Sequence, residues 1–143
     1  MKTLKSFLLG LTLMVVGIIA KADEPEAAKL SKNYAIATYI NAMAQGKTEG
    51  LDNVLDQSAK FSMLRGKKVL SFSKTDMLNF MNSNANIAQN CTVNTSVVEK
   101  ESNNDVSVIK VDMQYTDFVR SNYVTVTNTG NGWKITNVYT VFK

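Results

Sequence analysis

The sequence predicts an α+β fold in which N-terminal helices pack on a strongly curved antiparallel sheet. A stretch free of Gly and Pro, Ala27 to Gln45, repeats its apolar residues at helical spacing. The last forty residues, Asn104 to Lys143, have the pattern of consecutive β-strands separated by turn residues. Two of the long strands change the phase of their alternation, which indicates β-bulges and therefore a sheet that curls.

Three helices are expected, and most of the sheet follows them. The first runs from Ala27 to Gln45, and Gly46 is suited to end it because glycine readily adopts the left-handed conformation of a C-cap. A second, short helix is expected after Thr48, a residue type that caps helix N-termini. Ser73 to Asp76 forms a capping box with Asp in place of Glu, which predicts a third helix that ends near Ser83.

The strands are bounded by polar turns. The predicted strands cover residues 59–64, 69–72, 92–99, 105–116, 123–128 and 133–142. Asn131-Gly132 between the last two is a strong hairpin signal, because both residues tolerate positive φ. A bulge is predicted near Val108-Ile109, where the parity of the apolar residues changes, and another between Ile135 and Val138 in the last strand.

The first 22 residues have the pattern of a secretory signal peptide. Two lysines precede an apolar segment from Phe7 to Ala20, and Ala20-Lys21-Ala22 fits a cleavage site. That segment has 14 residues, whereas a membrane-spanning helix needs about 20. The only cysteine, Cys91, is far from the cleavage site, so no lipid anchor is expected. We therefore expect one domain, residues 23–143, that is periplasmic or secreted and has no membrane contact after cleavage.

The charge balance gives no support for a nucleic-acid partner. The full chain has 16 basic and 12 acidic residues, but Lys2, Lys5 and Lys21 would leave with the signal peptide. The 13 basic residues that remain against 12 acidic ones give a net charge of only +1. Histidine is absent, and neither a cysteine cluster nor a Gly-rich phosphate loop is present. No metal and no cofactor are expected.

The order of these elements, with a last hairpin that reads Gly130-Asn131-Gly132-Trp133-Lys134-Ile135, resembles the nuclear transport factor 2-like (NTF2-like) superfamily, also classed as cystatin-like. More narrowly, the chain resembles the small exported bacterial proteins grouped as "putative lumazine-binding" or SnoaL-like. Phe61-Ser62-Met63 and Gly66-Lys67 at the first hairpin add to the likeness, which covers about Lys29 to Phe142. The resemblance implies a cone-shaped fold, a pocket at its wide end, and homodimers formed through the face of the sheet.

Aromatic, sulfur-containing and basic residues are the candidates for lining such a pocket. The candidates are Tyr34, Tyr39, Met43, Met113, Tyr115, Arg120, Tyr123, Trp133 and Tyr139. The aromatic residues fit either a flat heterocyclic ligand or an ordinary core with hydroxyl groups at its rim. Arg120 could receive a carboxylate or phosphate, whereas Asp112 and Asp117 fit either the pocket mouth or a solvated outer face.

Catalysis is not the favoured interpretation. Isomerases of the superfamily need a carboxylate base near the first strand pair, yet Phe61 to Ser73 contains no Asp or Glu. We expect no catalytic residue and a domain that binds a small apolar or heterocyclic ligand, or a partner protein. Two alternatives stay open. One is a SnoaL-like or ketosteroid-isomerase-like isomerase or cyclase that uses Tyr39 with Asp112 or Asp117, and the other is a structural module that dimerises.

Overall fold

The computed structural model describes residues 26–100 and 104–143, so the predicted signal peptide lies outside the described part. Within it, the helices are the short 3-10 helix η1 (Ala28–Leu30), α2 (Lys32–Gln45), α3 (Leu51–Val54) and α4 (Lys74–Ser83). The strands are β1 (Leu55–Arg65), β2 (Lys68–Ser73), β3 (Thr92–Lys100), β4 (Val106–Gln114), β5 (Val119–Thr129) and β6 (Gly132–Phe142). No helix among these is both long enough and apolar enough to cross a membrane.

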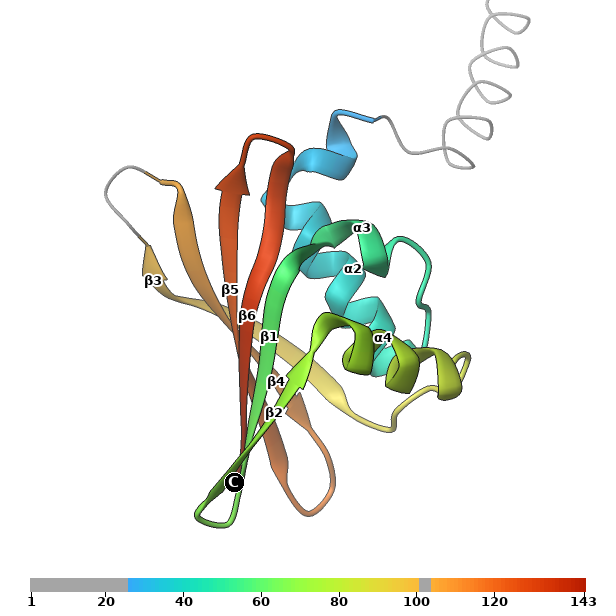
Figure 1. Ribbon diagram of the computed structural model, residues 1–143. Coiled ribbons are helices and arrows are strands. Elements are labelled where there is room, and N and C mark those ends of the chain that lie inside the picture. The colour runs from blue at the N-terminus through green and yellow to red at the C-terminus, as the bar shows by residue number, and fades with distance from the viewer. Residues whose placement is uncertain (1–25, 101–103) are drawn as a thin grey trace, which may run out of the picture.

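The six strands form one mixed sheet in the order β2-β1-β6-β5-β4-β3. Its neighbours pair antiparallel except β1 and β6, which run parallel. Figure 1 shows the sheet strongly twisted and curled, with α2, α3 and α4 together on one side of it. The predicted α+β class with helices on a curved sheet is confirmed. The parallel pair was not predicted, because contacts between strands so distant in the sequence leave no local pattern.

Register shifts bend the sheet. On β6, Thr136 is an extra residue relative to β5, which confirms the bulge predicted between Ile135 and Val138. The bulge predicted near Val108-Ile109 lies instead on the partner strand, where Val98 of β3 is the extra residue opposite that pair. β4 itself alternates regularly, because the small Ser107 takes an inward, buried position in line with its apolar neighbours.

The last hairpin turns within the predicted segment Gly130-Asn131-Gly132, and its two-residue loop, Gly130-Asn131, lies between the paired residues Thr129 and Gly132. Of the predicted turn residues Asn131 and Gly132, only Gly132 has a positive φ (96°), which corrects the expected turn geometry. A type I turn followed by a left-handed glycine gives this pattern. A Cβ atom at Gly132 would lie 2.9 Å from the Leu30 side chain of η1, so glycine is required there by space as well as by conformation.

The sheet wraps around α2. The predicted helix from Ala27 is broken at Ser31, whose backbone is extended and whose Oγ accepts a hydrogen bond from Tyr34 N (3.1 Å) to cap α2. The buried face of α2 consists of Ala35, Ile36, Thr38, Tyr39, Ala42, Met43 and Ala44. This face packs on the apolar inner positions of the sheet to form the core. Gly46 ends α2 in the left-handed conformation, as predicted (φ 69°).

A buried lysine fixes the position of α4. The predicted capping box is confirmed, since Ser73 Oγ accepts from Asp76 N and Asp76 Oδ2 accepts from Ser73 N, both at 3.1 Å. Lys74 is 8% exposed, and its Nζ donates to the carbonyl oxygens of Asp52 and Leu55, each at 3.0 Å. It also pairs with the Asp52 carboxylate at 2.9 Å. These bonds tie the start of α4 to α3 and β1.

The short helix α3 begins later than predicted. Gly50, not Thr48, precedes its first residue, and Gly50 is left-handed with φ 77°. The Thr48 carbonyl accepts a hydrogen bond from Leu51 N (3.2 Å), so Thr48 lies in the turn that leads into the helix. The predicted N-cap was therefore wrong by two positions, because the left-handed glycine supplies the reversal of the chain.

Gly46→Ala is expected to destabilise the fold by roughly 2–4 kcal/mol. The new Cβ would lie 2.6 Å from the backbone nitrogen of Ile87, at a residue with φ +69°. Gly66 in the β1–β2 turn is a matched control, because its φ is +63° but nothing lies within 4 Å of a Cβ there. Gly66→Ala should cost about 1 kcal/mol. Urea denaturation measures both, and equal losses would contradict the importance of the contact between Gly46 and Ile87.

Candidate functional site

A cavity of about 530 Å³ lies between the helix-facing side of the sheet, α2 and α4. Its lining consists of Met43 from α2, Met63, Arg65, Leu70 and Phe72 from β1 and β2, Asp76, Met77, Asn79 and Phe80 from α4, and Arg120 from β5. The lining is mostly apolar, with three methionines and two phenylalanines. Two arginines and one aspartate leave it with a net charge of +1.

Arg120 is held in place by a buried polar network. Its Nε donates to Asn122 Oδ1 at 3.1 Å, and Thr140 Oγ1 donates to the same oxygen at 2.8 Å. Asn122 has no exposed surface, and its Nδ2 donates to the Val111 carbonyl at 3.2 Å. The guanidinium also lies over the ring of Phe142, with 5.9 Å from Cζ to the ring centroid. Asn122 therefore orients Arg120 from inside the sheet.

Arg120 forms no ion pair within residues 26–100 and 104–143. The three ion pairs of that part of the chain involve lysines, and none involves Arg120. Its Nε is committed to Asn122, and no described residue accepts a hydrogen bond from its two terminal nitrogens. Every fully buried polar side-chain atom described has a partner, so these two nitrogens keep access to the solvent in the cavity.

Tyr39 is the second polar group near this point. It is 3% exposed, and burial raises the pKa of its hydroxyl to about 12, although the nearby charge of Arg120 acts in the opposite direction. Tyr39 is therefore a neutral hydrogen-bond donor and acceptor throughout the physiological pH range. Its hydroxyl makes no hydrogen bond to another described residue.

Three aromatic side chains gather next to Arg120. Tyr115 stacks on Phe118 with ring centroids 4.5 Å apart, and Phe118 lies 6.1 Å from Phe142. The Tyr115 hydroxyl donates to Gln89 Oε1 at 3.1 Å, and burial followed by the neighbouring Cys91 raises its pKa. Cys91 is partly buried and packs against the core as a small apolar side chain. These three aromatic residues lie beside Arg120, but none of them lines the cavity.

The structure brings two of the nine predicted pocket residues into the cavity, Met43 and Arg120. Tyr39 and Met113 are buried in the adjoining core, and Met113 is the cross-strand partner of Arg120. Tyr115 belongs to the aromatic group described above. The cavity thus adjoins five of the predicted residues, but only two of them line it.

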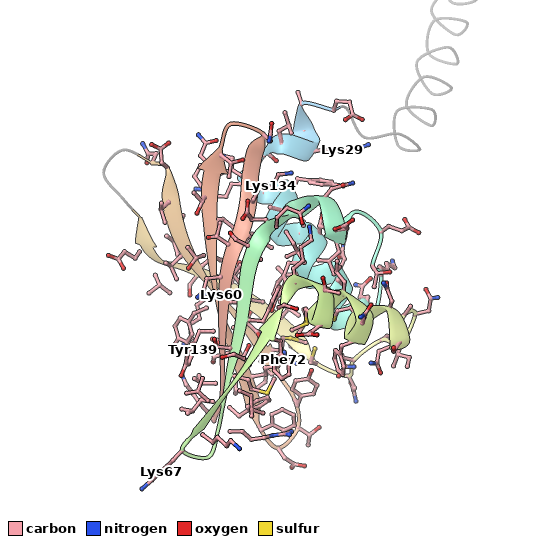
Figure 2. All side chains as sticks on the ribbon, in the orientation of Figure 1. Lys29, Lys60, Lys67, Phe72, Lys134 and Tyr139 are labelled. Carbon is pink, nitrogen blue, oxygen red and sulfur yellow. The ribbon has the colours of Figure 1, made fainter. Side chains whose placement is uncertain are left out.

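The other four predicted residues do not line this cavity. Tyr34 and Trp133 lie toward the N-terminal end of α2, where the Trp133 ring has Lys32 Nζ 5.1 Å from its centroid. Tyr123 and Tyr139 are direct cross-strand partners on the face of the sheet away from the helices, since their neighbours in sequence point inward. Figure 2 shows Tyr139 on that outer side.

The carboxylates of the isomerase alternative do not meet Tyr39. Asp112 is on the outer face, where it accepts a hydrogen bond from Ser121 Oγ (2.6 Å) and pairs with Lys110 (3.5 Å), so the sheet separates it from α2. Asp117 is exposed in the turn after β4. Asp76 is the one acid in the cavity lining, and hydrogen bonds from the backbone and side chain of Ser73 lower its pKa. A carboxyl group with a lowered pKa is a weaker general base.

Sequence reasoning missed most of the lining. The missed residues are Met63, Arg65, Leu70, Phe72, Asp76, Met77, Asn79 and Phe80. Two sequence patterns could have identified four of these residues. Met63 and Leu70 are cross-strand partners in a register that the Gly66-Lys67 turn fixes, so they share one face. Met77 and Phe80 are three residues apart and therefore neighbours on one face of α4.

Solved structures with this fold share little sequence with the chain. An NTF2-like protein of unknown function from Methylobacillus flagellatus has a TM-score of 0.59 at 20% identity and covers 78% of this chain and 88% of its own. One from Silicibacter pomeroyi has a TM-score of 0.58 at 15% identity, with coverages of 78% and 90%. A third, from Shewanella baltica, has 0.58 at 5% identity, with 77% and 89%. The chain therefore has the NTF2-like fold.

The sequence itself identifies the family. A family model described as "Putative lumazine-binding" matches residues 31–140, which is most of the chain. The chain belongs to this family and has the NTF2-like fold. A search of curated proteins finds none that matches it.

Asn122→Ala is expected to destabilise the protein by roughly 2–4 kcal/mol. The change removes the acceptor of Arg120 Nε and Thr140 Oγ1 and the donor to the Val111 carbonyl, all in a site without water access to Asn122. Thr140→Val removes one of these bonds and should cost about 1 kcal/mol. Urea denaturation distinguishes the two. If Asn122→Ala costs no more than Thr140→Val, the network does not hold Arg120 as described.

Proposed function

We propose that this protein is a non-enzymatic binding domain that takes a small, mostly apolar molecule into the cavity between α4 and the sheet. One observation carries the proposal: the cavity of about 530 Å³ is lined by methionine, leucine and phenylalanine side chains around a few polar groups. Small-molecule sites in proteins have this size and this mixture of an apolar wall with few, well-placed polar groups.

The exposure of the aromatic lining supports this proposal. Phe80 is 59% exposed and Phe72 is 37% exposed, although both side chains belong to the cavity wall. Large apolar groups that remain in contact with water around a concave site gain free energy when a ligand covers them. The three methionines of the lining are flexible and polarizable, so they can adapt to ligands of different shape.

A flat heterocycle is one chemical class that suits this wall. The family description names lumazine binding, and the rings of Phe72 and Phe80 offer aromatic surfaces for such a molecule. The isomerase or cyclase alternative lacks a suitable base, because the capping box of α4 engages the carboxylate of Asp76. We therefore favour binding without chemistry.

Export and dimerisation stay predictions that accompany this proposal. Residues 1–22 carry the signal-peptide pattern. The outer face of the sheet presents the paired, half-buried Tyr123 and Tyr139 beside Lys110, whose Nζ lies 5.9 Å from the Tyr123 ring centroid. We propose that a second copy of the chain binds this face, in preference to a different protein.

Phe80→Ala is expected to weaken binding of the neutral fluorescent probe N-phenyl-1-naphthylamine by roughly three- to tenfold, the effect of about 1 kcal/mol of lost apolar contact. Ile87→Ala is the matched control, because Ile87 is similarly exposed (53%) but lies outside the cavity lining. Fluorescence titration measures both variants, and lumazine serves as a second probe by thermal shift.

Two results would contradict the proposed function. One is an equal loss of probe affinity in Phe80→Ala and Ile87→Ala, which would place the probe elsewhere on the surface. The other is that neither probe binds the unaltered protein at millimolar concentration.

A further inference from the structure

The cavity has a polar end that the proposed function does not use. Arg120 presents two terminal nitrogens without a partner among the described residues, in a cavity that is otherwise mostly apolar. A guanidinium facing apolar walls without a counter-ion is an unfavourable arrangement, because its charge is partly removed from water. An oxyanion on the ligand would relieve this cost.

We propose that the ligand is an amphipathic monoanion, an organic carboxylate with an apolar body, whose carboxylate binds the terminal nitrogens of Arg120. This inference rests on the proposed function and deepens it, since it assigns the orientation and the charge of the ligand. The apolar body lies along Met43, Met77 and Phe80, away from the arginine.

The geometry of Arg120 favours a carboxylate. Because Asn122 holds its Nε, the two terminal nitrogens remain as a pair of parallel donors, which match the two oxygens of one carboxylate. Asn122 is itself fixed by Thr140 and by the Val111 carbonyl, so the guanidinium is oriented before a ligand arrives. Such preorganisation lowers the entropic cost of binding.

The charges of the lining limit the ligand to one negative charge. Arg65, Arg120 and Asp76 together carry a net charge of +1, so a monoanion neutralises the cavity whereas a phosphate dianion would leave an excess.

Basic residues at the β1–β2 hairpin add a longer-range attraction. Arg65 lines the cavity, and Lys67 and Lys68 are exposed at the same hairpin. Figure 2 shows Lys67 at the very tip, extended into solvent. Positive charges beside a cavity raise the local concentration of anions and their rate of entry. These exposed groups steer an anion, whereas the half-buried Arg120 holds it.

The test uses octanoate, 1-octanol and octyl phosphate as probes of equal chain length, measured by isothermal titration calorimetry on the full exported domain. The unaltered protein should bind octanoate at least about tenfold more tightly than 1-octanol. Arg120→Gln should abolish that difference by weakening octanoate binding at least about tenfold relative to 1-octanol. Arg65→Gln is the matched control and should weaken octanoate binding by no more than about threefold, because Arg65 is exposed to solvent.

Arg120→Lys keeps the positive charge but not the paired donors, so it should retain part of the preference for octanoate. It also keeps the test valid if Arg120→Gln fails to fold, which urea denaturation of each variant reveals.

Equal affinity for octanoate and 1-octanol in the unaltered protein would overturn the carboxylate assignment and leave the binding function standing. Tighter binding of octyl phosphate than of octanoate, dependent on Arg120, would also overturn it. Failure of all three probes to bind would overturn both proposals.

Discussion

The packing of α2 against the inner face of β5 and β6 determines the rest of the structure. At the η1 end, Val126 of β5 and Ile135 of β6 are fully buried in the core that α2 covers. The helix ends at Gly46, but the strands continue to Phe142, and the bulge on β6 keeps them curling. Beyond the helix end the sheet is therefore uncovered, and α4 crosses part of that space, as Figure 1 shows. The cavity is the part of this space that α4 does not fill.

The inner face of the sheet changes chemistry along the same direction. Beside α2 it presents valine and isoleucine, and toward the cavity β5 and β6 present Asn122, Thr140 and Arg120 at the corresponding inward positions. Polar groups at buried positions are stable only when they are paired, and Asn122 uses both its oxygen and its amide group. The terminal nitrogens of Arg120 are the part of this network that remains for a ligand. Fold and proposed site thus follow from one gradient of polarity along the strands.

Structural features that depend on interactions within a few residues of sequence could be predicted. Features that depend on contacts between distant residues could not. The Ser73 to Asp76 capping box and the Gly46 C-cap were correct, because each is a local interaction with its own sequence pattern. The parallel pairing of β1 with β6 has no such pattern. For the site, residue type suggested Arg120 and Met43, which line the cavity, but also Tyr123 and Tyr139, which lie on the outer face. Which face a strand residue occupies depends on the register, and a bulge changes it.

The cavity beneath α4 is the binding site that we propose, and this claim can be tested directly. The most direct test is ¹H–¹³C NMR of methionine methyl groups during titration with octanoate, since the lining contains Met43, Met63 and Met77. Met81 is the internal reference, because it lies on the same helix as Met77 but is buried in the core and outside the lining. The claim predicts saturable shifts of the three lining methyl groups with one common Kd and little change at Met81. Shifts at Met81 as large as those at Met77, or unchanged lining methyl groups at saturating octanoate, would contradict it.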